Sequence, residues 1–307
     1  MKAFIRILTW LGIMAGLTLL AMGVWYLAFG GSQTTTSLKC LQFLQTLGTF
    51  LIPPVLCAWM WDTGHRPFRW LKMDQRAHWS LFVIAVGIMI CAVPAINLLS
   101  DLNSRIELPE SLASIEQILK QQEEAAALLT ERFLQADNVA QLLLNLGLLA
   151  LLPALAEELS FRGTLQQILS NSPQDGLTAQ RSVSVSGLSA KRSAVAIWAT
   201  AFIFSAIHLQ FYGFVPRMLM GAMFGYVFVW SGSLWLPVLM HFTNNALAVL
   251  AYYLTSHSAS GLTGEAGFAS NNIADTFGAG DTWYIGLISI LITFLGLLIF
   301  YRRTRTR

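Results

Sequence analysis

Five ionisable side chains lie within long apolar stretches of this sequence, and they are its first candidates for chemistry. They are Glu157, Glu158, Arg162, His208 and His241. An ionisable group at bilayer depth costs about 3 kcal/mol on insertion scales unless it is paired or hydrated, so each is a functional candidate. The first three apolar stretches carry almost no such residue, which places the predicted site in the second half of the chain.

The first cluster is the sequence ALAEELSFRG, from Ala154 to Gly163. Glu158 and Arg162 are four residues apart with the acid first, the favourable order for an ion pair along a helix. Glu157 projects about 100° away around the helix and could act as a general base. The alternative is that all three residues form one buried ion pair that only fixes helix packing.

Two further clusters each place a histidine four residues from another side chain. In FIFSAIHL, Phe204 and His208 are predicted to share one face of a helix, and in HFTNNAL the same spacing joins His241 and Asn245. A histidine and an amide directed at one point can polarise a carbonyl or hold an oxyanion. Asn244 is expected to pack or hydrogen-bond between helices. A glutamate, two histidines and an asparagine therefore come from three predicted spans.

These three motifs, in this order, resemble a known family. EELSFRG, FSAIH and HFTNN are similar to the EExxxR, FxxxH and HxxxN signatures of the CAAX-protease and bacteriocin-processing family of intramembrane proteases. The glycine-dotted run from Gly221 to His241 also resembles the segment that precedes the third motif in that family. The resemblance covers roughly Val139 to Leu254, and no motif position departs from the pattern.

The resemblance implies hydrolysis of a peptide bond within the membrane. It assigns water activation to Glu157 with help from His208, the oxyanion site to His241 and Asn245, and a supporting ion pair to Glu158 and Arg162. A divalent metal such as zinc is the alternative, held by Glu157, His208 and His241 with an open fourth position. Because the chain has no HExxH motif, we favour a glutamate-type mechanism without metal over a metallopeptidase.

Two other classes of protein also fit the buried polar residues. A proton-coupled transporter places Glu, His and Arg in the bilayer, but it usually shows broken helices in both halves of the chain. A non-enzymatic membrane scaffold or bacteriocin-immunity protein would retain the motifs as structure only. The enzyme is the preferred interpretation, with membrane lipid and a protein or peptide substrate as partners and no nucleic acid.

The elements that must position these residues are apolar helices. Of 307 residues, 55% are hydrophobic and only 11% are charged, which is too few charges for a soluble surface of this size. Apolar runs of about 18 residues or more indicate membrane-spanning helices. The fold class is therefore all-α, a polytopic membrane helix bundle of about eight transmembrane helices. The predicted spans are Ile7–Phe29, Leu41–Trp61, Trp79–Leu99, Val139–Ala156, Ala194–Gln210, Phe214–Trp230, Leu234–Leu254 and Trp283–Tyr301.

The distribution of basic residues predicts the orientation. With both termini in the cytoplasm, most Lys and Arg residues fall on the inner side, including four arginines in the six residues after Tyr301. The outer segments hold only Lys39, Arg105, Lys120, Arg132 and Arg217. We therefore expect an integral multi-pass protein of a bacterial inner (cell) membrane, whose first helix is retained rather than cleaved as a signal peptide.

Residues 1–307 are predicted to form a single membrane domain, with residues 139–254 as the protease core. Residues 100–138 form a predicted extramembrane insertion, in which Ser111 to Phe133 has the spacing of an amphipathic helix at the membrane surface. Because this helix holds no motif residue, we expect it to be dispensable for chemistry. A second loop, from Thr255 to Asp281, is rich in Gly, Ala, Ser and Asn and is expected to be flexible.

Overall fold

The computed structural model describes residues 2–170, 186–259 and 277–306, and these residues form helices and no strand. The prediction of an all-α membrane bundle is confirmed. The helices are α1 (Lys2–Phe29), α2 (Thr35–Gln45), α3 (Ile52–Trp61), α4 (Pro67–Trp70), α5 (Trp79–Ser104), α6 (Ala113–Leu134), α7 (Val139–Asn145), α8 (Leu152–Ser160), α9 (Gln167–Leu169), α10 (Ser186–Ala206), α11 (Phe214–Ser231), α12 (Trp235–Ala259) and α14 (Trp283–Arg305). Three π-helical segments interrupt them, η1 (Thr46–Leu51), η3 (Leu146–Leu151) and η4 (Phe161–Gln166), and two short 3-10 turns are η2 (Glu110–Leu112) and η5 (Gly280–Thr282).

Among the residues that the structure describes, six helical runs are long and apolar enough to cross a membrane. They are Lys2–Phe29, Thr35–Trp61, Trp79–Ser104, Val139–Leu169, Phe214–Ser231 and Gly280–Arg305. The other two predicted spans overlap with α10 and α12, of 21 and 25 residues, which have sufficient length but are not among the six. The polytopic class is thus confirmed, and the number eight stays a prediction.

The predicted orientation can be tested with reporter fusions at the chain end and after two of the connecting segments. Eight spans with cytoplasmic termini should place a reporter after Asn138 outside and a reporter after Arg307 inside, because the basic residues concentrate on the inner segments. A third fusion, after Arg76, is the control and should agree with the fusion after Arg307. Reporters after Asn138 and Arg307 on the same side would contradict this arrangement.

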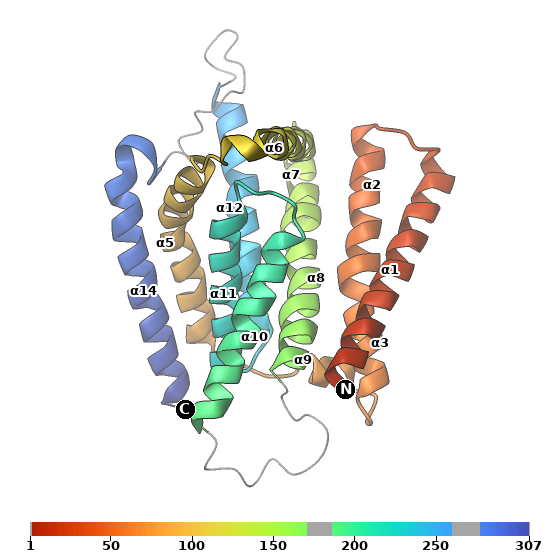
Figure 1. The fold of residues 1–307 in the computed structure, drawn as a ribbon, viewed down its shortest axis with the longest axis vertical. Helices are drawn as coiled ribbons and strands as arrows, with labels where there is room; N and C mark the ends of the chain where they lie inside the picture. Colours follow the sequence, from red (N-terminus) through yellow and green to blue (C-terminus); the bar gives the residue numbers. More distant parts are fainter. Residues whose placement is uncertain (1, 171–185, 260–276, 307) are drawn as a thin grey trace. The chain divides into compact units, whose positions relative to one another are not determined.

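The described residues divide into two compact units whose boundaries fall within several helices. The first unit comprises Met1–His78, Leu152–Phe204 and Gly221–Val238, and the second comprises Trp79–Leu151, Ser205–Met220 and Leu239–Arg307. In the first unit, α1 runs antiparallel to the continuous run α2–η1–α3 (Figure 1). Gly48 permits their close approach, since a Cβ there would lie 2.7 Å from the Leu17 carbonyl oxygen.

Prolines explain where two of the helices widen into π-helix. Segment η1 ends just before Pro53 and Pro54, and η3 ends just before Pro153. Proline has no N–H and cannot continue the regular i to i−4 hydrogen bonds, so the preceding turn changes its pattern. Pro54 cannot bond the Phe50 carbonyl in this way, and that carbonyl accepts a hydrogen bond from Ser160 Oγ at 2.8 Å instead. This contact attaches the end of α8 to η1.

In the second unit, α5 and α14 pack side by side (Figure 1). Pro94 lies within α5, and beside it the Ser289 hydroxyl accepts from the Ala95 N–H at 3.0 Å and donates to the Cys91 carbonyl. In a regular helix, Ala95 would donate to Cys91 directly. The Ser289 hydroxyl therefore replaces one hydrogen bond of α5 and ties α14 to it.

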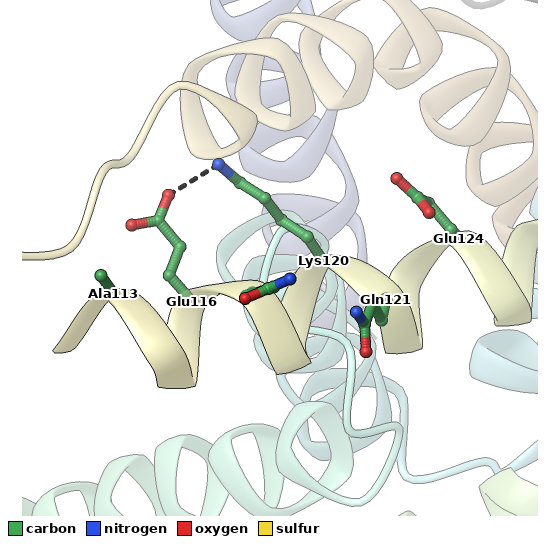
Figure 2. A pocket seen from close by; sticks show the side chains of 6 residues that line it. Ala113, Glu116, Lys120, Gln121 and Glu124 are labelled. Atoms are coloured by element: carbon green, nitrogen blue, oxygen red, sulfur yellow. Dashed lines mark ion pairs between the residues drawn. The ribbon is translucent and has the colours of Figure 1, made fainter.

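Helix α6 confirms the helix that the amphipathic spacing predicted, shifted by one or two residues. It lies crosswise at one end of α5 and α7 (Figure 1). A hollow of about 500 Å³ lies along one face of α6. Figure 2 shows the side chains that line it, among them Lys120 and Glu116. These two form an ion pair at 2.7 Å. The hydrogen bond between these two side chains lowers the pKa of Glu116 and raises the pKa of Lys120. The location of α6 at the membrane surface stays a prediction.

The predicted loop from Thr255 to Asp281 begins too early. Helix α12 continues to Ala259, because Thr255 and Ser256 donate their hydroxyls to carbonyls of the preceding turn and remain compatible with a helix. Residues 260–276 lie outside the described residues.

Candidate functional site

Helix α8 carries both glutamates of the first motif, in different surroundings. Glu158 is fully buried and forms a 2.7 Å ion pair with Arg162, which is also fully buried. The neighbouring Glu157 is half-buried. The ion pair expected from the i, i+4 spacing is therefore present, although the helix changes from α8 to the π-helical η4 between the two residues. The role of the pair in supporting Glu157 stays a prediction.

Arg162 makes more contacts than its spacing indicated. Its Nη2 donates to the Gly221 carbonyl of α11 at 2.8 Å, while its Cζ lies 4.8 Å from the centre of the Phe204 ring and 5.4 Å from that of Phe224. An arginine over aromatic faces gains cation–π attraction, which is larger in a desolvated site. Arg162 thus joins η4 to α10 and α11. The contact between Arg162 and the Phe204 ring could not be predicted from the FxxxH motif.

The glycines of α11 allow this close packing. A Cβ on Gly221 would lie 3.2 Å from the Phe204 ring, and a Cβ on Gly225 would lie 2.8 Å from Gln166 Oε1. Gln166 Nε2 donates to the Gly225 carbonyl at 3.2 Å, so two polar side chains reach carbonyls four residues apart on α11. Gly221 and Gly225 form the small-xxx-small spacing that lets helices approach in membranes. That spacing was visible in the sequence, but its polar partners were not.

His208 is not on a helix, which corrects the prediction that it shares a helix face with Phe204. Helix α10 ends at Ala206, and the His208 and Leu209 N–H groups bond the carbonyls three residues earlier. Leu209 adopts a positive φ of 53°, a left-handed conformation that ends the helix and costs a non-glycine residue about 1–2 kcal/mol. The half-buried His208 therefore lies in a turn between α10 and α11. The predicted span Ala194–Gln210 therefore ends four residues too late, and α10 also begins earlier, at Ser186.

Helix α12 carries the third motif as predicted, with His241 and Asn245 one turn apart on the same side. His241 is 7% exposed and Asn245 is half-buried. Asn245 Oδ1 accepts a hydrogen bond from Asn244 Nδ2 at 3.2 Å. Asn244 therefore contacts the neighbouring amide, a contact that the sequence analysis did not anticipate.

The predicted residues are distributed over both compact units. Glu157, Glu158 and Arg162 belong to the first unit, and His208, His241 and Asn245 belong to the second. Within either unit, the described residues include no group of three His, Cys, Asp or Glu side chains that could hold a metal ion. The convergence of all six residues on one site is therefore part of the functional proposal.

Comparison with known protein families gives evidence that is independent of this geometry. Residues 139–247 match the family model described as type II CAAX prenyl endopeptidase Rce1-like. This part of the chain is similar to the Rce1-like CAAX-protease family. The matched segment includes all three motifs and nearly coincides with the predicted core of residues 139–254, which confirms the resemblance seen in the sequence. No curated protein and no solved structure matches the chain.

The Rce1-like family is one of intramembrane CAAX-type proteases, which agrees with the helical architecture. Together, the long apolar helices and the family identify an integral multi-pass membrane protein. The match covers about a third of the chain, and α1 to α6 and α14 lie outside it.

Proposed function

We propose that this protein is an intramembrane endopeptidase that uses a glutamate and a histidine to activate water. The observation that carries the proposal is the half-buried Glu157 beside the fully buried Glu158–Arg162 pair, within the segment that matches the Rce1-like family. Glu158 has its charge matched by Arg162, whereas the more accessible Glu157 is directed elsewhere around the helix. This difference in pairing and exposure favours Glu157 as the residue that takes up a proton.

In the proposed reaction, the Glu157 carboxylate takes a proton from a water molecule while the water oxygen attacks the scissile carbonyl carbon. His208 helps to orient this water. The carbonyl oxygen becomes an oxyanion, which accepts hydrogen bonds from His241 and Asn245. The carbon–nitrogen bond then breaks as the proton from Glu157 passes to the leaving amine. Water has been added across the peptide bond, and the carboxylate is restored.

A metal is the alternative to this glutamate-type mechanism. Two imidazoles and a carboxylate from Glu157, His208 and His241 have the chemistry of a catalytic zinc site, in which the metal lowers the pKa of its bound water. Neither compact unit alone brings three such donors together among the described residues. The proposed reaction therefore contains no metal-dependent step. The assay that tests the function is repeated in the presence of a chelator.

The proposal is tested by incubating the purified protein, in detergent and in lipid vesicles, with membrane-inserting peptides. The panel includes matched peptides with and without a prenylated C-terminal CAAX sequence. Mass spectrometry should find cleavage at a defined internal bond, and the two peptide forms show whether the lipid contributes to recognition. Repeating the assay with a chelator and then with zinc separates the two mechanisms. No cleavage in any arm would favour a non-enzymatic scaffold.

A further inference from the structure

The segment that carries His208 leads into helix α11, which is preceded by a glycine. Helix α11 begins at Phe214, so the residue before it is Gly213, which has no side chain to accept a hydrogen bond from the first turn. Pro216 contributes no N–H, and the N–H groups of Phe214 and Arg217 bond the carbonyls of Phe211 and Gly213. The remaining first-turn donor, the Val215 N–H, bonds a side chain from outside the connecting segment.

Asn103, at the end of α5, supplies that acceptor. Its Oδ1 accepts from the Val215 N–H at 3.3 Å, and its Nδ2 donates to the Phe211 carbonyl at 2.9 Å. Asn103 is 4% exposed, so both hydrogen bonds are shielded from water. One amide therefore caps α11 and also holds the segment before it, at two points that are four residues apart.

Other contacts hold the same segment from different helices. Ser205 Oγ of α10 donates to the Phe214 carbonyl at 2.7 Å, and the Tyr212 N–H lies 3.4 Å from Glu123 Oε2 of α6. A hollow of about 940 Å³ lies beside the segment, with Glu123, Tyr212 and Gly213 in its lining. Asn103 and Glu123 both lie outside the segment that matches the Rce1-like family.

We propose that Asn103 is a positioning residue for His208, which rests on the proposed function of His208 in water activation. His208 precedes Leu209, whose positive φ must be held by the surrounding structure. The hydrogen bonds of Asn103 fix the backbone just after Leu209. Without them, the turn has more freedom and His208 spends less time in the geometry that the reaction needs. Asn103 acts through the backbone and does not touch the reacting atoms.

The experiment compares Asn103→Ala and Asn103→Asp with Asn97→Ala as the matched control. Asn97 lies on the same helix and donates to the Phe277 carbonyl at 3.1 Å, so it holds a different segment. Asn103→Asp keeps the acceptor for Val215 but replaces the donor to Phe211 with a second oxygen. Both Asn103 variants should lower kcat about 10–100-fold with little change in KM, because misplacing a catalytic group has effects of this size.

Hydrogen exchange measured by mass spectrometry on the same samples gives a readout that does not depend on activity. Amides in the segment 207–215 should exchange faster in both Asn103 variants than in the wild type, and Asn97→Ala should leave that segment unchanged. Faster exchange with wild-type kcat would overturn the proposal, as would an equal loss of kcat in Asn97→Ala. If Asn103→Ala does not fold, Asn103→Asp alone decides between these outcomes.

Failure of this inference can be distinguished from failure of the proposed function. A wild-type protein that hydrolyses peptides, together with fully active Asn103 variants, refutes only the positioning role. A wild-type protein that hydrolyses none of the peptides refutes the hydrolytic function and, with it, a positioning role in hydrolysis.

Discussion

Glu157→Gln is expected to yield a folded protein that hydrolyses peptides about 10²–10⁴-fold more slowly than the wild type, the range for loss of a general base. Glutamine has nearly the same shape as glutamate but cannot take up a proton from water. Because Glu157 is half-buried and Glu158 is already paired with Arg162, the substitution should disturb packing little. The measurement is turnover on a cleaved peptide, together with a thermal melt of the same preparation.

Substitutions of the other proposed catalytic residues test whether each has the role assigned to it. His208→Ala should also slow turnover strongly, because His208 orients the attacking water. His241→Ala and Asn245→Ala should each cost roughly 10²–10³ in rate, because each removes one oxyanion donor and leaves the base intact. Glu124→Gln on the exposed side of α6 is the control for the loss of a carboxylate and should retain wild-type turnover. If Glu157→Gln keeps wild-type turnover, the role assigned to Glu157 is wrong, and Glu158 is the next base to test.

The sequence was sufficient to predict the membrane bundle and the match to a protease family, because both depend on local patterns. Long apolar runs determine membrane-spanning helices almost alone, and three motifs in a fixed order are a specific signature. The i, i+4 spacing of Glu158 and Arg162 likewise predicted an ion pair that the structure contains. These features required no knowledge of which helices are neighbours.

Features that depend on backbone detail or on distant contacts could not be predicted in this way. Apolar periodicity continues past Ala206, so it could not reveal that Leu209 adopts a positive φ and that His208 lies in a turn. The contacts of Arg162 with Phe204 and Phe224 join three helices, and spacing within one helix carries no information about them.

Helix α6 is a similar case. Because it holds no motif residue, α6 is predicted to be dispensable for chemistry, and this stays a prediction. Glu123 of α6 contacts the segment that follows His208. Glu123 is 85 residues from His208 in the sequence, so no motif could link the two.

Arg162→Ala is expected to be strongly destabilising, and loss of folding or expression should precede any measurable loss of activity. The substitution leaves the fully buried Glu158 without the cation that it contacts, and breaking a buried ion pair in this way costs about 3–5 kcal/mol. It also removes the hydrogen bond to the Gly221 carbonyl and the contacts with two aromatic rings. Thermal melts and expression levels in detergent measure the effect.

The matched control is Arg105→Ala. Arg105 pairs with Asp101 at 2.8 Å with the same i, i+4 spacing and the same order of acid and base, but the two side chains are 65% and 29% exposed. An exposed pair contributes about 0–1 kcal/mol, so Arg105→Ala should melt close to the wild type. The control therefore shows what loss of an exposed ion pair alone does to the melting temperature.

A double substitution then separates the charge of Glu158 from the packing of Arg162. Glu158→Gln combined with Arg162→Gln leaves no buried charge, so it should recover part of the stability that Arg162→Ala loses. Recovery should be incomplete, because glutamine is shorter than arginine and carries no charge to interact with Phe204 and Phe224. If the double variant is no more stable than Arg162→Ala, packing around Arg162 dominates its contribution. If Arg162→Ala melts at the wild-type temperature, the buried pair is not a structural support of this helix.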